Sequence, residues 1–86
     1  MKQATVTYTN WKGARGMRTI MPLTLRWGTC PYHGEQAIWL LDGIDVDKQA
    51  MRTFSWADFG SDAERAILRE ILLGNTVHAS RKGITN

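Results

Sequence analysis

Residues 37–41 read Ala-Ile-Trp-Leu-Leu, a continuous apolar run of the length of a β-strand. A short run without a polar face indicates a strand that is buried on both sides, so we expect it at the centre of a sheet. Outward from this run, apolar and polar residues alternate with a period of two, as they do in half-buried strands. The other four runs are residues 5–8, 15–21, 23–27 and 50–56. The chain therefore predicts five short strands.

Turn-forming residues separate these runs. Residues 10–13 (Asn-Trp-Lys-Gly) predict a hairpin between the first two strands. Pro22 is expected to end the second strand, because proline cannot donate a hydrogen bond to a neighbouring strand. Residues 28–36 predict a loop that carries an aromatic side chain and a histidine, and the polar residues 42–48 predict a turn.

The period changes after Gly60. Ser61 and Glu64 have the spacing of a capping box, which begins a helix, and Gly74-Asn75 supplies the residues that commonly end one. Between them lie apolar residues at helical spacing: Ala63, Ile67, Leu68, Ile71 and Leu72. The prediction is a single domain over residues 1–75, mainly β, with a closing helix over residues 61–73. Residues 76–86 are expected to be a short, disordered basic tail.

The charge of the chain is unevenly distributed. Residues 1–34 hold five Lys or Arg and no acid, whereas all eight acids lie in residues 35–70. A basic first half favours anionic partners such as nucleotides or nucleic acid. A single cysteine, Cys30, excludes an internal disulfide, and no apolar stretch has membrane-spanning length. We therefore expect a cytoplasmic protein with no membrane partner.

Arg18 and Arg52 each fall inside a predicted strand, next to residues that should be buried. A guanidinium in such a place needs a partner, since an unpaired buried charge is unfavourable. That partner could be a phosphate of a ligand, which arginine binds through two parallel hydrogen bonds. It could equally be an internal carboxylate, and the candidates are Asp45, Asp47 and Asp58.

Aromatic residues adjoin several of these cations. Trp11 lies in the hairpin turn, where we expect it to be exposed, and Arg26-Trp27 directly precede the loop that carries Tyr32-His33. Bases of single-stranded nucleic acid commonly stack on exposed rings while cations hold the phosphates. The alternative for each ring is packing in the core.

One ordered set of residues runs through most of the chain: Tyr8, Asn10, Gly13, Arg18, Pro22, Trp27-Gly28, Tyr32-His33, Trp39-Leu40-Leu41, Asp45, Asp47-Lys48 and Arg52-Thr53-Phe54. This set resembles the WYL domain, and most closely the short solitary WYL-like proteins of bacteria and their phages. Leu40 stands where that family often has tyrosine. The resemblance implies an SH3-like or Sm-like five-stranded barrel that senses nucleotides or single-stranded nucleic acid. It implies the cytoplasm of a bacterial cell as the location, with the gene carried by the bacterium or by a phage. It implies a binding role for Tyr8, Arg18, Tyr32, His33, Trp39 and Arg52.

Enzymatic function is not supported by any pattern of residues. Cys30 and His33 have no orienting Asn or Asp near them, and Asp42, Asp45 and Asp47 lack the spacing of a calcium loop. We therefore expect a non-enzymatic binding module without a cofactor or a bound metal. Its predicted ligand-binding residues are Tyr8, Trp11, Arg18, Arg26, Trp27, Tyr32, His33 and Arg52. The alternative is an accessory or regulatory protein, carried by a phage or another mobile element, that acts through protein contacts, self-association or sequestration of a nucleotide signal.

Overall fold

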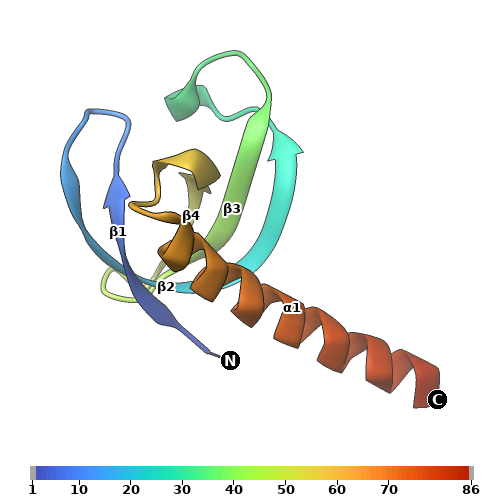
Figure 1. Cartoon of the computed structure of the whole chain (residues 1–86). Coiled ribbons are helices and arrows are strands. Elements are labelled where there is room, and N and C mark those ends of the chain that lie inside the picture. The colour runs from blue at the N-terminus through green and yellow to red at the C-terminus, as the bar shows by residue number, and fades with distance from the viewer. Residues whose placement is uncertain (1, 86) are drawn as a thin grey trace.

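The computed structural model describes residues 2–85, and the side chains of residues 2–74. Within them, one antiparallel sheet has the strand order β1-β2-β3-β4 (Figure 1). The strands are β1 (Ala4–Thr9), β2 (Arg15–Gly28), β3 (Ile38–Asp45) and β4 (Ala50–Ser55). The helices are two short 3-10 turns, η1 (Pro31–His33) and η2 (Trp56–Asp58), and the long helix α1 (Asp62–Thr85).

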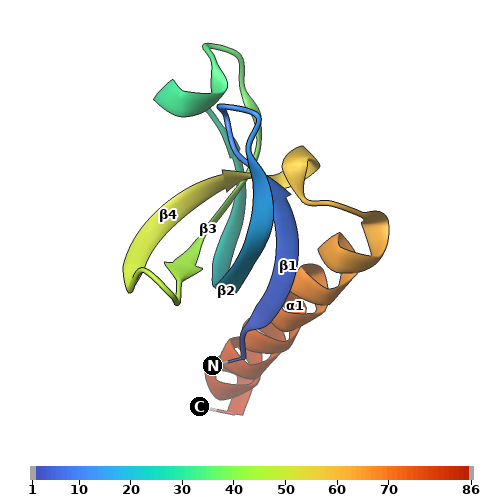
Figure 2. The same ribbon diagram turned by 90° about the vertical axis from the view of Figure 1, so that its left-hand side faces the viewer.

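The predicted five-stranded barrel is wrong, because the second and third predicted strands are one. Pro22 does not end a strand; it pairs with Gly43 inside β2, and the register shifts between Pro22 and Thr24. An irregularity of this kind bends a strand without terminating it. With four strands the sheet is open, and Figure 2 shows it curling so that the edge strands β1 and β4 stand apart.

The predicted turn over residues 42–48 is also wrong in its first half, because β3 continues to Asp45. Gly43 makes this continuation possible. A Cβ atom at Gly43 would lie only 2.8 Å from the carbonyl oxygen of Met21, at the bend in β2. At this point β2 and β3 approach too closely for any side chain. Gly43, which suggested a turn in the sequence, instead allows the two strands to pair where the sheet bends sharply.

The apolar run that suggested a central strand does lie in one. β3 is flanked by β2 and β4, and Leu40 and Leu41, whose side chains point to opposite faces, are both fully buried. The main core cluster joins the strands to α1 and consists of Val6, Tyr8, Ile20, Leu41, Phe54, Phe59, Leu68 and Leu72.

The chain after β4 crosses the open side of the sheet. Phe59 forms a single bridge to Tyr8, and the amide of Gly60 donates to the carbonyl of Thr7 at 2.9 Å. In addition, the backbone amide of Ser55 donates to the hydroxyl of Tyr8 at 2.8 Å. These contacts connect the two edges of the sheet without pairing β1 with β4.

The predicted capping residues begin α1, although the glutamate acts differently from a standard capping box. The amide of Glu64 donates to Ser61 Oγ at 3.2 Å, as expected. The Glu64 carboxylate, however, accepts a hydrogen bond from the backbone amide of Thr7 on β1, as well as one from the Ser61 hydroxyl. The Thr7 bond first, and the Ser61 bond second, hold the pKa of Glu64 below its ordinary value. This carboxylate therefore fastens the start of α1 to the edge of the sheet.

The far end of α1 differs from the prediction. The helix continues past Gly74 to Thr85, because Gly74 does not take the left-handed conformation that a helix-ending glycine adopts. The predicted basic tail over residues 76–86 therefore falls mostly within α1, and its side chains lie outside the described residues. In the described part of the chain, no helix combines the length and the apolar character needed to cross a membrane.

Candidate functional site

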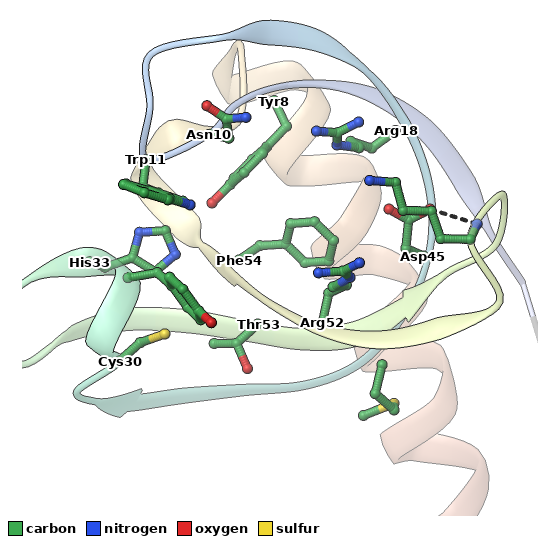
Figure 3. A pocket seen from close by; sticks show the side chains of 13 residues that line it. Tyr8, Asn10, Trp11, Arg18, Cys30, His33, Asp45, Arg52, Thr53 and Phe54 are labelled. Carbon is green, nitrogen blue, oxygen red and sulfur yellow. Dashed lines mark hydrogen bonds between the residues drawn. The ribbon is translucent and has the colours of Figure 1, made fainter.

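The concave face of the sheet carries a pocket of about 450 Å³ (Figure 3). Its walls come from β1, the turn after β1, β2, the η1 loop, the end of β3, and β4. Six of the eight predicted ligand-binding residues line it: Tyr8, Trp11, Arg18, Tyr32, His33 and Arg52. The structure thus gathers side chains that are up to 44 positions apart in the sequence.

The register of the sheet explains why the two arginines meet. Ile20 pairs with Asp45, and Gly43 pairs with Arg52. Directly paired residues share a face of the sheet, as do residues two apart in one strand. Arg18, Asp45 and Arg52 therefore all point to the concave side, from three different strands.

Neither Arg18 nor Arg52 has an internal partner among the described side chains. The ion pairs that those side chains form are Arg26–Asp42 and Arg65–Asp62, and no hydrogen bond involves the guanidinium of Arg18 or Arg52. Within residues 2–74, therefore, neither arginine forms the internal salt bridge that the sequence left open as an alternative. Figure 3 shows both arginines at one end of the pocket, together with Asp45.

Asp45 and Lys48 complete this cationic end. Asp45 is only 3% exposed, and its Oδ1 accepts a long hydrogen bond of 3.4 Å from the backbone amide of Lys48. The same turn brings Gln49 into the left-handed region, with φ at 51°. The polar turn predicted over residues 42–48 did not identify Asp45 and Lys48 as pocket residues. Their signal was the spacing of Leu41, Gly43 and Asp45, which places all three on one face if the strand is extended.

The opposite end of the pocket is aromatic. Trp11 and Tyr32 are 59% and 66% exposed, and their ring centroids lie 6.0 Å apart with the planes tilted by 35°. The ammonium of Lys12 lies 5.2 Å from the centre of the Trp11 ring. Figure 3 shows His33 beside Trp11 at this end.

The turn that presents Trp11 is held by Asn10. Its side-chain oxygen accepts hydrogen bonds from the amides of Lys12 and Ala14, at 3.0 Å and 2.9 Å. Gly13 takes a positive φ of 84°, which few other residues adopt without strain. As we predicted, Trp11 is exposed, on a turn that these hydrogen bonds hold, and is not part of the core.

Tyr8 and Phe54 form the floor between the two ends. Their rings meet edge to face at 5.1 Å, and both belong to the core cluster. Burial raises the pKa of the Tyr8 phenol, an effect only partly opposed by the hydrogen bond from Ser55. The Tyr8 phenol is therefore neutral, and its contacts with Ser55, Phe54 and Phe59 hold the core together.

Arg26 and Trp27, the other two predicted residues, lie elsewhere. Arg26 points to the opposite face of the sheet, where its Nε donates to Asp42 Oδ2 at 2.5 Å. This hydrogen bond is the main reason that the pKa of Asp42 lies below its ordinary value. Trp27 packs edge to face with Trp39 at 5.4 Å, beside a second, mostly apolar hollow of about 260 Å³.

Comparison of the chain with protein-family models, with curated proteins and with solved structures finds no match. The resemblance to WYL domains therefore stays a prediction. Among the described residues, no group of three or more His, Cys, Asp or Glu is placed to hold a metal ion. The geometry alone presents a pocket with cations at one end, exposed rings at the other and an apolar floor.

Proposed function

We propose that this pocket binds a nucleotide, either free or at the end of a single strand of nucleic acid. The phosphate would lie among Arg18, Lys48 and Arg52, and the base would stack on the Trp11–Tyr32 pair. The observation that carries the proposal is that arginines without a partner in residues 2–74 and exposed rings lie at opposite ends of one pocket.

The charge balance supports an anionic ligand. Three cations and one carboxylate line the pocket, so two positive charges are in excess when His33 is neutral. Arginine binds phosphate oxygens in a bidentate manner, which favours Arg18 and Arg52 as the principal contacts. A ligand phosphate would give both guanidinium groups the partner that they lack among residues 2–74.

The aromatic end and the size of the pocket support a nucleotide over a simple anion. A base stacked on an exposed ring contributes about 1–3 kcal/mol, and Trp11 and Tyr32 already contact each other, so a base would stack on an outer face of the pair. A volume of about 450 Å³ lies within the roughly 300–1,000 Å³ that is usual for small-molecule sites. We therefore favour one bound nucleotide over an extended strand, in a binding module without catalytic activity.

The second candidate function is a contact with a partner protein, and a specific observation favours it. Trp27 and Trp39 are 60% and 50% exposed and lie together, with Ile38 and Trp56, along the second hollow. Exposed tryptophans are characteristic anchors of protein interfaces. This surface is distinct from the nucleotide pocket, so the two functions are compatible in one chain.

The proposed function is tested by titrating the purified protein with adenosine monophosphate while recording tryptophan fluorescence and backbone amide shifts. We expect shifts centred on Trp11, Arg18 and Arg52, and binding that weakens between about 50 mM and about 200 mM salt. Adenosine, which lacks the phosphate, is the matched control and should bind more weakly. Absence of any shift in this pocket with the nucleotide would overturn the proposal.

A further inference from the structure

Asp45 has hydrogen-bonding capacity that the protein leaves unused. Its Oδ1 accepts the one long bond from the amide of Lys48, and its Oδ2 accepts none within the described residues. A carboxylate offers about four acceptor positions. Asp45 is almost completely buried and lines the pocket, so further donors can reach its carboxylate only from the pocket side. A hydrogen-bond donor on a ligand would therefore be stabilised at this carboxylate.

The position of Asp45 limits what such a ligand can be. The carboxylate lies at the same end of the pocket as Arg18 and Arg52, where the phosphate is proposed to bind. A second anionic group at that place would be repelled by Asp45. A ligand that uses the free acceptor positions of Asp45 would therefore carry neutral donors on the part of the molecule that is next to its phosphate.

The ribose of a nucleotide has this arrangement. Its 2′ and 3′ hydroxyls are two donors on adjacent carbons, on the same sugar as the 5′ phosphate, and a carboxylate has two oxygens to accept them. An acidic side chain recognises ribose hydroxyls in the same chemical manner in dinucleotide-binding proteins. We infer that Asp45 makes the pocket selective for nucleotides whose ribose has free 2′ and 3′ hydroxyls, and this inference rests on the proposed function.

This selectivity narrows the class of ligand. Deoxyribonucleotides lack the 2′ hydroxyl, which distinguishes RNA from DNA at a protein site. Nucleotides inside a strand lack a free 3′ hydroxyl, because it is esterified to the next phosphate. The ligands that remain are free ribonucleotides with a 5′ phosphate and the 3′-terminal nucleotide of an RNA strand.

The first test uses the unchanged protein and varies only the ligand. Adenosine 5′-monophosphate and its 2′,3′-dideoxy analogue are titrated separately, with amide shifts as the measurement. Since hydrogen bonds to a charged group are stronger than neutral ones, we expect the ribonucleotide to bind about tenfold more tightly or better. Equal affinities would overturn this inference and leave the proposed function intact. If neither ligand binds, both the inference and the proposed function are overturned.

The second test assigns the selectivity to Asp45. Asp45→Asn keeps the size of the side chain, and we expect it to reduce the preference for the ribonucleotide to near unity. Asp47→Asn, at an exposed position in the same turn, is the matched control with the same change of charge and should keep the preference. Amide spectra confirm that each variant is folded. If Asp45→Asn keeps the full preference, the assignment to Asp45 is overturned; if that variant does not fold, the comparison of ligands on the unchanged protein still decides the selectivity.

Discussion

The backbone amide of Ser55 and the hydroxyl of Tyr8 are joined by a 2.8 Å hydrogen bond, although their strands, β4 and β1, are the two edges of the sheet. Both residues are buried, at 5% and 4% exposure. A single phenol oxygen thus spans the side of the sheet that strand pairing leaves open. It also forms part of the pocket floor, which links the stability of the fold to the shape of the site.

Tyr8→Phe should therefore destabilise the protein. The substitution keeps the ring contacts with Phe54 and Phe59 but leaves the buried amide of Ser55 without an acceptor, which costs about 1–3 kcal/mol. Urea unfolding followed by tryptophan fluorescence measures the loss. Tyr32→Phe, at an exposed ring, is the control and should unfold at the midpoint of the unchanged protein. A Tyr8→Phe variant with an unaltered midpoint would show that the hydrogen bond does not stabilise the fold.

Gly43→Ala should also be destabilising, because the added Cβ would lie 2.8 Å from the Met21 carbonyl oxygen and 3.1 Å from Ile20 Cγ2. Overpacking of this kind costs about 1–3 kcal/mol. Gly16→Ala, also in a strand, is the matched control, since a Cβ there meets nothing within 4 Å. Thermal unfolding of both variants checks the prediction, and equal melting temperatures would contradict the close approach of β2 and β3.

Glu64 should make stability depend on pH on the acid side. Its pKa is lowered in the folded protein, first by the amide of Thr7, so its contribution is complete above the ordinary value of 4.5. The contribution is lost as the pH falls from that value through the lower folded pKa. Glu64→Gln should therefore unfold at lower urea than the unchanged protein at neutral pH, and this difference should shrink below pH 4.5.

Urea midpoints measured over a series of pH values test this dependence on Glu64. Glu70→Gln, on an exposed part of α1, provides the same change of charge and should leave the midpoint unaltered throughout. A difference between Glu64→Gln and the unchanged protein that stayed constant down to the lowest pH would argue against the carboxylate as its source.

Removing either cation of the pocket should weaken nucleotide binding. Arg18→Gln and Arg52→Gln each delete a charged donor to the proposed phosphate, so we expect an affinity lower by about tenfold and a shallower dependence on salt. Arg69→Gln, at an exposed position of α1, changes the net charge equally and should bind like the unchanged protein. Isothermal titration of the three variants with adenosine monophosphate compares them. Equal affinity of all three would mean that the arginines do not contact the phosphate.

Local patterns in the sequence predicted most of the secondary structure. The hairpin at residues 10–13 and the Ser61 cap are set by interactions within a few residues. The central strand around Leu40-Leu41 was recognised from its continuous apolar run, and both residues are fully buried. The barrel was predicted wrongly because Pro22 and Gly43 usually interrupt strands, whereas here they face each other and bend the sheet. Only pairing between distant segments shows that these two residues belong to one curve.

The site was predicted only in part for the same reason, because pairing between distant segments decides which side chains meet in the pocket. Arg18 and Arg52 could be recognised as unusual cations within strands, and Trp11 as an exposed ring in a turn. Arg26 and Trp27 were grouped with them because of their nearness in sequence to Tyr32, but the register turns Arg26 to the other face of the sheet. Asp45 and Lys48 were overlooked as pocket residues because the end of β3 could not be located from composition.

Because the sheet is open on one side, a ligand in the pocket would affect the stability of the curled sheet. The walls of the pocket include residues of both edge strands, β1 and β4, so a bound ligand would hold these two strands at a fixed separation. A ligand that binds only the curled state stabilises that curvature by an amount that rises with the ratio of its concentration to its Kd. Hydrogen exchange of the Ser55 amide would then report whether the pocket is occupied. This amide exchanges only when its hydrogen bond to Tyr8 on the other edge strand is broken.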